Sequence, residues 1–160
     1  MNVLIRQAVR RPGTNYAYIA KTYGQAKDPA WNAVLKRCLT PDKTRNTVTF
    51  NEAELRVSFA NGSQIKLYGS ENAETLRGIH LDGVVFDEYA LIAPNVWEQV
   101  VSPTLSRRKG GAIFIGTPMG RNHFYSLYKK AQGWADWFTT TIRAEERGVL
   151  SDEELARQRA

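Results

Sequence analysis

The sequence feature that most constrains the fold is a short apolar run that ends in two adjacent carboxylates. Val84, Val85 and Phe86 follow one another without a polar interruption and lead directly into Asp87 and Glu88. Such a run of β-branched and aromatic residues is typical of a strand buried on both faces of a parallel α/β sheet. Ligands of these sheets bind at the carboxyl ends of the strands, so we expect both carboxylates to lie at a binding edge.

Two acidic residues at a strand end have a recognisable chemistry. Asp87 can hold a magnesium ion through water, and Glu88 can orient or deprotonate an attacking water molecule. This is the Walker B arrangement of P-loop ATPases. The same pattern also arises when a strand simply runs into an acidic loop, so the rest of the sequence must decide between the two interpretations.

A second apolar run carries a complementary feature. Residues Ala112–Ile115 predict another buried strand, which ends in Gly116-Thr117-Pro118-Met119-Gly120. If the two strands are parallel neighbours, the Thr117 hydroxyl lies beside the metal and water positions of Asp87 and Glu88. The alternative is that Thr117 belongs to an ordinary turn.

Composition limits the chain to one core. Its 160 residues are 42% hydrophobic, which suits one domain or part of one. There is no apolar run of about 18 residues and no signal-peptide pattern, so we expect a soluble intracellular protein without a membrane partner. The net charge of +6 permits DNA contact but equally suits a mildly basic solvated surface. The single cysteine, Cys38, excludes an internal disulfide and is expected to fill the core.

The N-terminal half alternates between helical and strand patterns. We predict a helix over residues 2–10, a strand over 16–20, and a helix that begins at Asp28-Pro29 and ends at Pro41. Period-two alternation then predicts an antiparallel hairpin around Asn61-Gly62, with residues 47–50 as a third strand. The core-facing stripe of the second helix contains Trp31, Val34, Leu35, Cys38 and Leu39.

The C-terminal half continues with helices between strands. Pro94 is expected to open a helix that Pro103 closes, and an amphipathic helix follows Asn122. Residues 137–142 predict a final strand, and a capping box at Ser151 predicts the start of another helix. The basic residues 107–109 are interpreted as a solvated loop or a contact for DNA phosphates.

Several stretches together resemble the ATPase domain of the terminase large subunit of tailed phages, the motor that pumps DNA into the capsid. One is TYGQAKDPAW at Thr22–Trp31, although Lys21 stands where the family commonly has proline. Another is Leu76-Arg77-Gly78 followed by the DGVVFDEYA strand. The last is VWEQVVSPTLSRRKGGAIFIGTPMG with the aromatic helix after it. They follow the family's order over nearly the whole chain, so their combination is more specific than any single motif.

The resemblance implies a fold and a set of roles. The fold class is α/β, a P-loop NTPase with a mostly parallel sheet, flanking helices and an inserted β-hairpin, incomplete at its N-terminus. By resemblance, Glu88 activates water, Asp87 binds Mg²⁺ and the nucleotide, and Thr117 belongs to the coupling motif and serves both catalysis and nucleotide binding. Arg77 is expected to reach the nucleotide of a neighbouring subunit, or else to anchor its loop by pairing with a nearby carboxylate such as Asp82.

The implied cofactors are ATP and Mg²⁺. The implied partners are double-stranded DNA, the terminase small subunit, the portal and further copies of the chain in a ring, all in the host cytoplasm.

One departure is serious. Neither a phosphate loop of the form GxxxxGK[ST] nor the adenine-contacting glutamine motif occurs in the sequence, and the family's nuclease domain is absent too. We therefore expect residues 1–160 to be a partial ATPase domain that is inactive alone. In the family, the strand before that loop lies between the strands corresponding to residues 112–115 and 137–142, so its absence is expected to leave two unpaired edges and a marginally stable chain.

Two other classes of function remain open. A non-catalytic DNA-binding or assembly module would use the basic surface and would not need the phosphate loop. A fragment of a superfamily 2 helicase-like ATPase would share the Asp-Glu strand. The helicase interpretation is weakened because Tyr89-Ala90 follows the acidic pair and because the coupling motif is TPMG.

Overall fold

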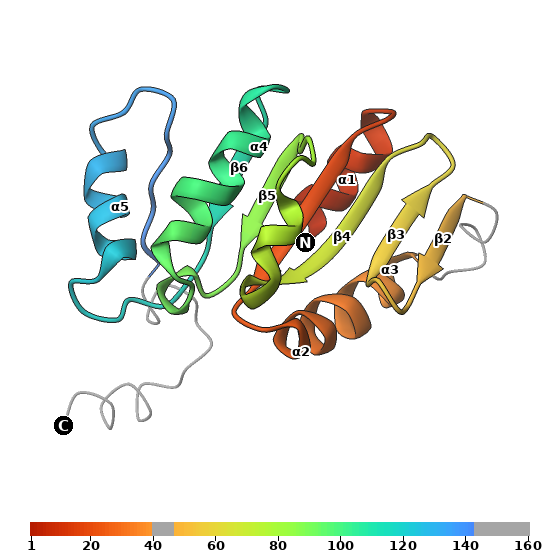
Figure 1. The fold of residues 1–160 in the computed structure, drawn as a ribbon, viewed down its shortest axis with the longest axis horizontal. Coiled ribbons are helices and arrows are strands. Elements are labelled where there is room, and N and C mark those ends of the chain that lie inside the picture. Colours follow the sequence, from red (N-terminus) through yellow and green to blue (C-terminus); the bar gives the residue numbers. More distant parts are fainter. Residues whose placement is uncertain (40–46, 143–160) are drawn as a thin grey trace. The chain divides into compact units, whose positions relative to one another are not determined.

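The computed structural model describes residues 1–39 and 47–142. They form an α/β fold around a six-stranded sheet in the order β2-β3-β4-β1-β5-β6 (Figure 1). Strands β1, β4, β5 and β6 are parallel, whereas β3 pairs antiparallel with β4 and β2. The predicted fold class is therefore confirmed. The strands are β1 Asn15–Ala20, β2 Val48–Asn51, β3 Arg56–Phe59, β4 Gln64–Gly69, β5 Gly83–Phe86 and β6 Gly111–Phe114.

The contacts divide the chain into two compact units, residues 1–120 and residues 121–160. The first unit holds the whole sheet. In the second, α5 (His123–Ala131) begins at Asn122, whose side-chain oxygen accepts hydrogen bonds from the amides of Phe124 and Tyr125 at 3.0 and 3.1 Å. This helix was predicted. No helix in the described part of either unit is long and apolar enough to cross a membrane.

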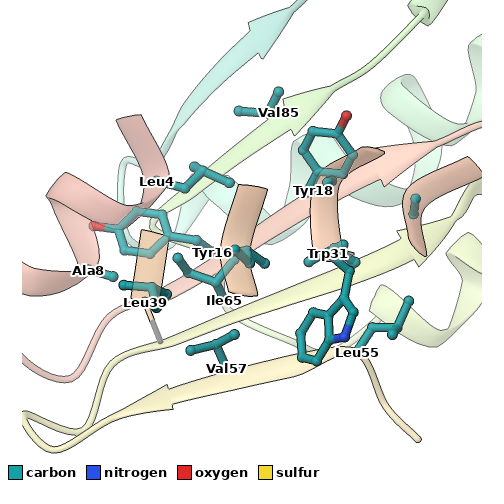
Figure 2. Packing of buried hydrophobic residues seen from close by; sticks show 14 of the residues in the cluster. Leu4, Ala8, Tyr16, Tyr18, Trp31, Leu39, Leu55, Val57, Ile65 and Val85 are labelled. Carbon is teal, nitrogen blue, oxygen red and sulfur yellow. The ribbon is translucent and has the colours of Figure 1, made fainter. Parts of the chain in front are cut away.

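The main core lies on one face of β1. Tyr16 and Tyr18 pack there in a cluster with Leu4 and Ala8 of α1 (Asn2–Arg10) and with Trp31 (Figure 2). Alternate residues of a strand face opposite sides, so the two tyrosines share this face. The helix predicted over residues 2–10 is confirmed, and its buried residues are Leu4 and Ala8.

The helix predicted to begin at Asp28 in fact begins upstream, at the Thr22 cap. The Thr22 hydroxyl accepts a hydrogen bond from the Gln25 amide at 3.2 Å, which satisfies one of the free amides at the helix start. Pro29 lies inside the helical segment, where its missing N–H is accommodated by wider, π-type turns. The segment comprises α2 Tyr23–Ala26, η1 Lys27–Lys36 and α3 Arg37–Leu39.

The wider turns also correct the prediction for Cys38. Trp31, Leu35 and Leu39, spaced four residues apart, are buried, whereas Cys38 is exposed. A helix with more residues per turn keeps a spacing of four on one face and turns the residue before Leu39 towards solvent. The predicted end at Pro41 lies outside the described residues.

The predicted hairpin is confirmed. Residues of β3 and β4 pair antiparallel, and the connecting turn contains Gly62 with φ +83°, a conformation that glycine adopts without steric cost. The third strand, predicted over residues 47–50, corresponds to β2.

Three predictions for the C-terminal half were wrong: the end of a helix at Pro103, a strand over residues 137–142, and the burial of the second apolar run on both faces. Pro103 does not close the helix after Pro94, because the helical segment continues from η5 (Val96–Val101) through α4 (Ser102–Ser106), with proline in the first turn of α4. Residues 137–142 form no strand, since an apolar pattern makes a strand only where a neighbouring backbone pairs with it. The helix predicted from Ser151 lies outside the described residues.

The third error concerns the second apolar run, which was expected to be buried on both faces. β6 is the last strand of the sheet, and Ile113 and Ile115 are 38% and 49% exposed. Its other face is covered, since Phe114 stacks on Phe86 at 5.0 Å between ring centroids and meets the edge of Trp97 at 4.9 Å. The run therefore has one packed face and one exposed face. The remaining short helices are η3 Ser70–Leu76 and η4 Tyr89–Leu91.

The glycine pair before β6 offers a matched test of packing. A Cβ on Gly110 would lie 2.6 Å from the Leu81 carbonyl oxygen and 2.7 Å from the side chain of Leu105, whereas a Cβ on Gly111 would meet nothing within 4 Å. We expect Gly110→Ala to lower the free energy of unfolding by about 1–3 kcal/mol, as overpacking does. Gly111→Ala should lower it by no more than about 0.5 kcal/mol. Urea denaturation measures both, and equal losses would contradict the close approach at Gly110.

Candidate functional site

The acidic pair lies in a turn at the carboxyl end of β5, held by backbone hydrogen bonds on both sides. The Asp87 amide donates to the Ile19 carbonyl of β1 at 2.8 Å. On the other side, the Tyr89 amide donates to the Ile115 carbonyl at 2.9 Å, just after β6. The turn is thus attached to both neighbouring strands, and the sheet itself fixes its position.

Glu88 has an unusual backbone. Its φ of 48° and ψ of 50° lie in the left-handed region, which for a residue with a side chain costs about 1–3 kcal/mol. Its carboxylate accepts a hydrogen bond from the Thr117 amide at 3.1 Å and contacts the Thr117 hydroxyl at 3.4 Å. The structure therefore brings together two of the predicted site residues, and Glu88 itself is exposed to solvent.

Asp87 is half-buried and has a partner that the sequence analysis did not predict. The hydroxyl of Tyr18, on β1, donates a hydrogen bond to Oδ2 of Asp87. Burial, together with this hydrogen bond and the charge of Asp87, raises the pKa of Tyr18 well above its ordinary value. The phenol is therefore protonated near neutral pH and acts as the donor.

The amino end of α1 lies near the same carboxylate. Burial lowers the pKa of the Met1 α-amino group, and the negative charge of Asp87 opposes that shift. No side chain caps the amides in the first turn of α1. Free amides at a helix N-terminus, aligned with the helix dipole, favour an anion such as phosphate.

An open pocket with a volume of about 390 Å³ borders the acidic turn on the side of β1. Asp87, Glu88, Lys21, Gln25 and Asp28 are among the residues that line it. The lining of the pocket is therefore both acidic and basic.

Arg77 is not brought to this cluster. Its guanidinium forms an ion pair with Glu74 and donates to the Gln99 carbonyl at 3.1 Å, and Glu74 raises the pKa of Arg77. The alternative, a pairing of Arg77 with a nearby carboxylate, is present, but the partner is Glu74 and not Asp82. The buried Asp82 carboxylate instead accepts hydrogen bonds from Arg108 and from the Asn15 amide, both at 2.8 Å.

The same contacts refine the interpretation of the basic residues 107–109. Arg108 donates to the Gly13 carbonyl at 3.1 Å as well as to Asp82, so it connects the loop before β6 to the start of β1. Arg107 lies 2.7 Å from a ring nitrogen of His80. At least Arg108 therefore has a structural role.

The side chains that could bind a metal limit the kind of metal site. Within residues 1–39 and 47–142, no three His, Cys, Asp or Glu side chains are grouped to hold a metal ion. Mg²⁺ seldom needs such a cage, because it keeps several waters and takes one or two carboxylates together with substrate phosphates. The half-buried Asp87 beside the amino end of α1 fits that pattern.

The fold defines the class as an α/β domain with a mostly parallel sheet. The chain is similar to the large terminase ATPase domain of Thermus phage P74-26, with a TM-score of 0.68 and 28% identity, covering 84% of this chain and 59% of that one. It shares its fold with the large terminase of a second thermophilic bacteriophage, with a TM-score of 0.76 and 21% identity, covering 98% of this chain and 39% of that one.

The sequence matches identify the family. The model for the family described as terminase large subunit, T4likevirus-type, N-terminal, matches residues 1–158. The terminase large subunit of Escherichia phage T5 is 30% identical over 155 residues, which cover 92% of this chain and 34% of that protein. The chain therefore belongs to the terminase large subunit family and matches its N-terminal ATPase domain.

The match covers only part of these relatives. The terminase large subunit of Thermus phage G20c is 40% identical over 72 residues, or 45% of this chain and 14% of that protein. The chain thus spans about a third or less of the curated relatives it matches.

Proposed function

We propose that this chain supplies the Walker B and coupling elements of an ATP-driven motor that moves double-stranded DNA into a phage capsid. The observation that carries the proposal is the contact between Glu88 and Thr117, beside Asp87 and at the carboxyl edge of parallel strands. The large terminase of the second thermophilic bacteriophage, which shares this fold, has been solved in complex with ADP and with ATP-γ-S. In the motor, the partners would be the small subunit, the portal and further copies of the chain in a ring.

Each residue has a role in this proposal. ATP would supply the phosphoryl group, and Mg²⁺ bound to it would neutralise the charge of the phosphates. Asp87 would hold the metal, and Glu88 would orient the attacking water and take its proton. The backbone amide of Thr117 donates to the Glu88 carboxylate and holds it in place. This contact couples the segment after β6 to the site.

We further propose that a separate segment supplies the phosphate loop, since no GxxxxGK[ST] occurs in the 160 residues. β6 offers the edge to which its strand can pair. The amides of Gly111 and Ile115 donate to β5, to the carbonyls of Asp82 and Phe86 at 3.3 and 2.9 Å. Alternate residues of a strand point their backbone groups to opposite edges, so Ala112 directs its N–H and C=O away from β5.

The test is to assay the chain with and without such a segment. We expect the purified 160-residue chain to show no DNA-stimulated ATP turnover, because it lacks the amides and the lysine that hold the β and γ phosphates. Fusing the strand and phosphate loop of the T5 or P74-26 protein to its N-terminus should produce magnesium-dependent turnover. The matched control is the same fusion with the loop lysine replaced by alanine.

Two results would contradict these proposals. One is turnover by the chain alone that Glu88→Gln abolishes, which would remove the need for a separate segment and leave the role of Glu88 standing. The other is a folded fusion that binds DNA but neither binds nor hydrolyses ATP, which would favour a non-catalytic DNA-binding or assembly module.

A further inference from the structure

We propose that Tyr18 is a positioning residue, which holds the Asp87 carboxylate in the orientation that receives the metal of the proposed function. The inference rests on that function, because it assigns Asp87 to the metal. The residue lies on a strand with no site motif, and its side chain is otherwise part of the core cluster (Figure 2).

The geometry gives β1 two attachments to Asp87. Tyr18 pairs in register with Val85, two residues before Asp87, so its ring reaches past the end of β5 and its hydroxyl meets Oδ2. The carbonyl of the next residue of β1, Ile19, accepts a hydrogen bond from the Asp87 amide at 2.8 Å. Consecutive residues of one strand thus hold both the main chain and the carboxylate of Asp87.

The two carboxylate oxygens of Asp87 therefore have different roles. A phenol has one proton to donate, and Tyr18 gives it to Oδ2. Oδ1 would then be available to a metal, in a carboxylate whose orientation the hydrogen bond fixes. Outer hydrogen bonds of this kind orient metal-binding side chains, and their loss typically weakens metal affinity by about 10- to 100-fold.

The competing explanation is that the hydrogen bond merely satisfies a buried phenol. Tyr16 provides the matched control, because it lies on the same face of the same strand and is 4% exposed, against 6% for Tyr18. Its hydroxyl is buried and has no hydrogen-bond partner among the described residues. Tyr16→Phe therefore removes the same atom without touching Asp87.

The first test uses Mn²⁺ alone as a paramagnetic probe of the 160-residue chain, followed by NMR. We expect Mn²⁺ to broaden the amide signals of Asp87 and Glu88, with half-maximal broadening at a concentration about 10-fold higher in Tyr18→Phe. Tyr16→Phe should match the unmodified chain, and thermal melting should show that both variants are folded. Broadening centred elsewhere, or an unchanged midpoint in Tyr18→Phe, would overturn the proposal.

The second test separates this inference from the proposed function. In the fusion that carries a phosphate loop, Tyr18→Phe should raise the Mg²⁺ concentration for half-maximal turnover about 10-fold and leave kcat at saturating Mg²⁺ nearly unchanged. Turnover with an unshifted Mg²⁺ midpoint would remove the role of Tyr18 and leave the proposed function standing. If Tyr18→Phe shifts the Mn²⁺ midpoint in the chain alone but the fusion does not hydrolyse ATP, the role of Tyr18 stands and the proposed function is removed.

Discussion

Replacing Glu88 by glutamine in the phosphate-loop fusion will slow ATP hydrolysis by about 10²- to 10⁴-fold and leave nucleotide affinity unchanged. Glutamine keeps a side-chain oxygen that can accept the hydrogen bond from the Thr117 amide, which the Glu88 carboxylate accepts at 3.1 Å. It loses only the ability to take a proton. Steady-state hydrolysis measures the first effect, and equilibrium binding of a fluorescent ATP analogue measures the second.

The control is Glu98→Gln, which neutralises an exposed carboxylate on the helical segment that follows the acidic turn. It should change turnover by less than about twofold, because surface substitutions away from a site have small effects. An equal loss of binding and turnover in Glu88→Gln would show that Glu88 holds the nucleotide and does not activate water.

The second large effect is expected at Arg77. In an assembled ring, Arg77→Ala should lower turnover by about 10³- to 10⁵-fold, the range for an arginine that reaches a neighbouring subunit's phosphate. Its side chain is 53% exposed and touches none of the site residues of its own chain among the contacts of the described residues. Mixing Arg77→Ala subunits with Glu88→Gln subunits should restore part of the turnover, since some interfaces then combine an intact arginine with an intact Glu88.

Glu74 provides the control for this prediction. Its carboxylate is the ion-pair partner of Arg77, so Glu74→Ala removes the anchor and keeps the arginine. If Arg77 only holds its loop, Glu74→Ala should reproduce most of the loss seen in Arg77→Ala. If no ratio of mixed subunits recovers turnover while all variants remain folded, the role across the interface should be dropped.

The sequence was sufficient for the centre of the sheet and for the proximity of Glu88 and Thr117. A short unbroken run of β-branched and aromatic residues is typical of a strand, and parallel strands place their carboxyl ends at one edge. That reasoning brought Glu88 and Thr117 together, as the structure does.

Other features depend on three-dimensional neighbours that a linear pattern does not encode. The helix start at Asp28 was a good local signal, but the Thr22 cap lies upstream and wide turns accommodate Pro29. The exposure of β6 follows from its place at the end of the sheet order. Tyr18 was missed because a tyrosine in a strand ordinarily indicates core, and only its register opposite Val85 directs the hydroxyl to Asp87.

The left-handed backbone of Glu88 has a consequence for timing. A residue held in a costly conformation returns to an ordinary one when its restraints are removed, and here the side-chain restraint comes from Thr117 on a different segment. Because the Thr117 amide belongs to the segment after β6, we expect displacement of that segment to turn the Glu88 carboxylate away from its present position. In the proposed motor, hydrolysis would then depend on the position of that segment.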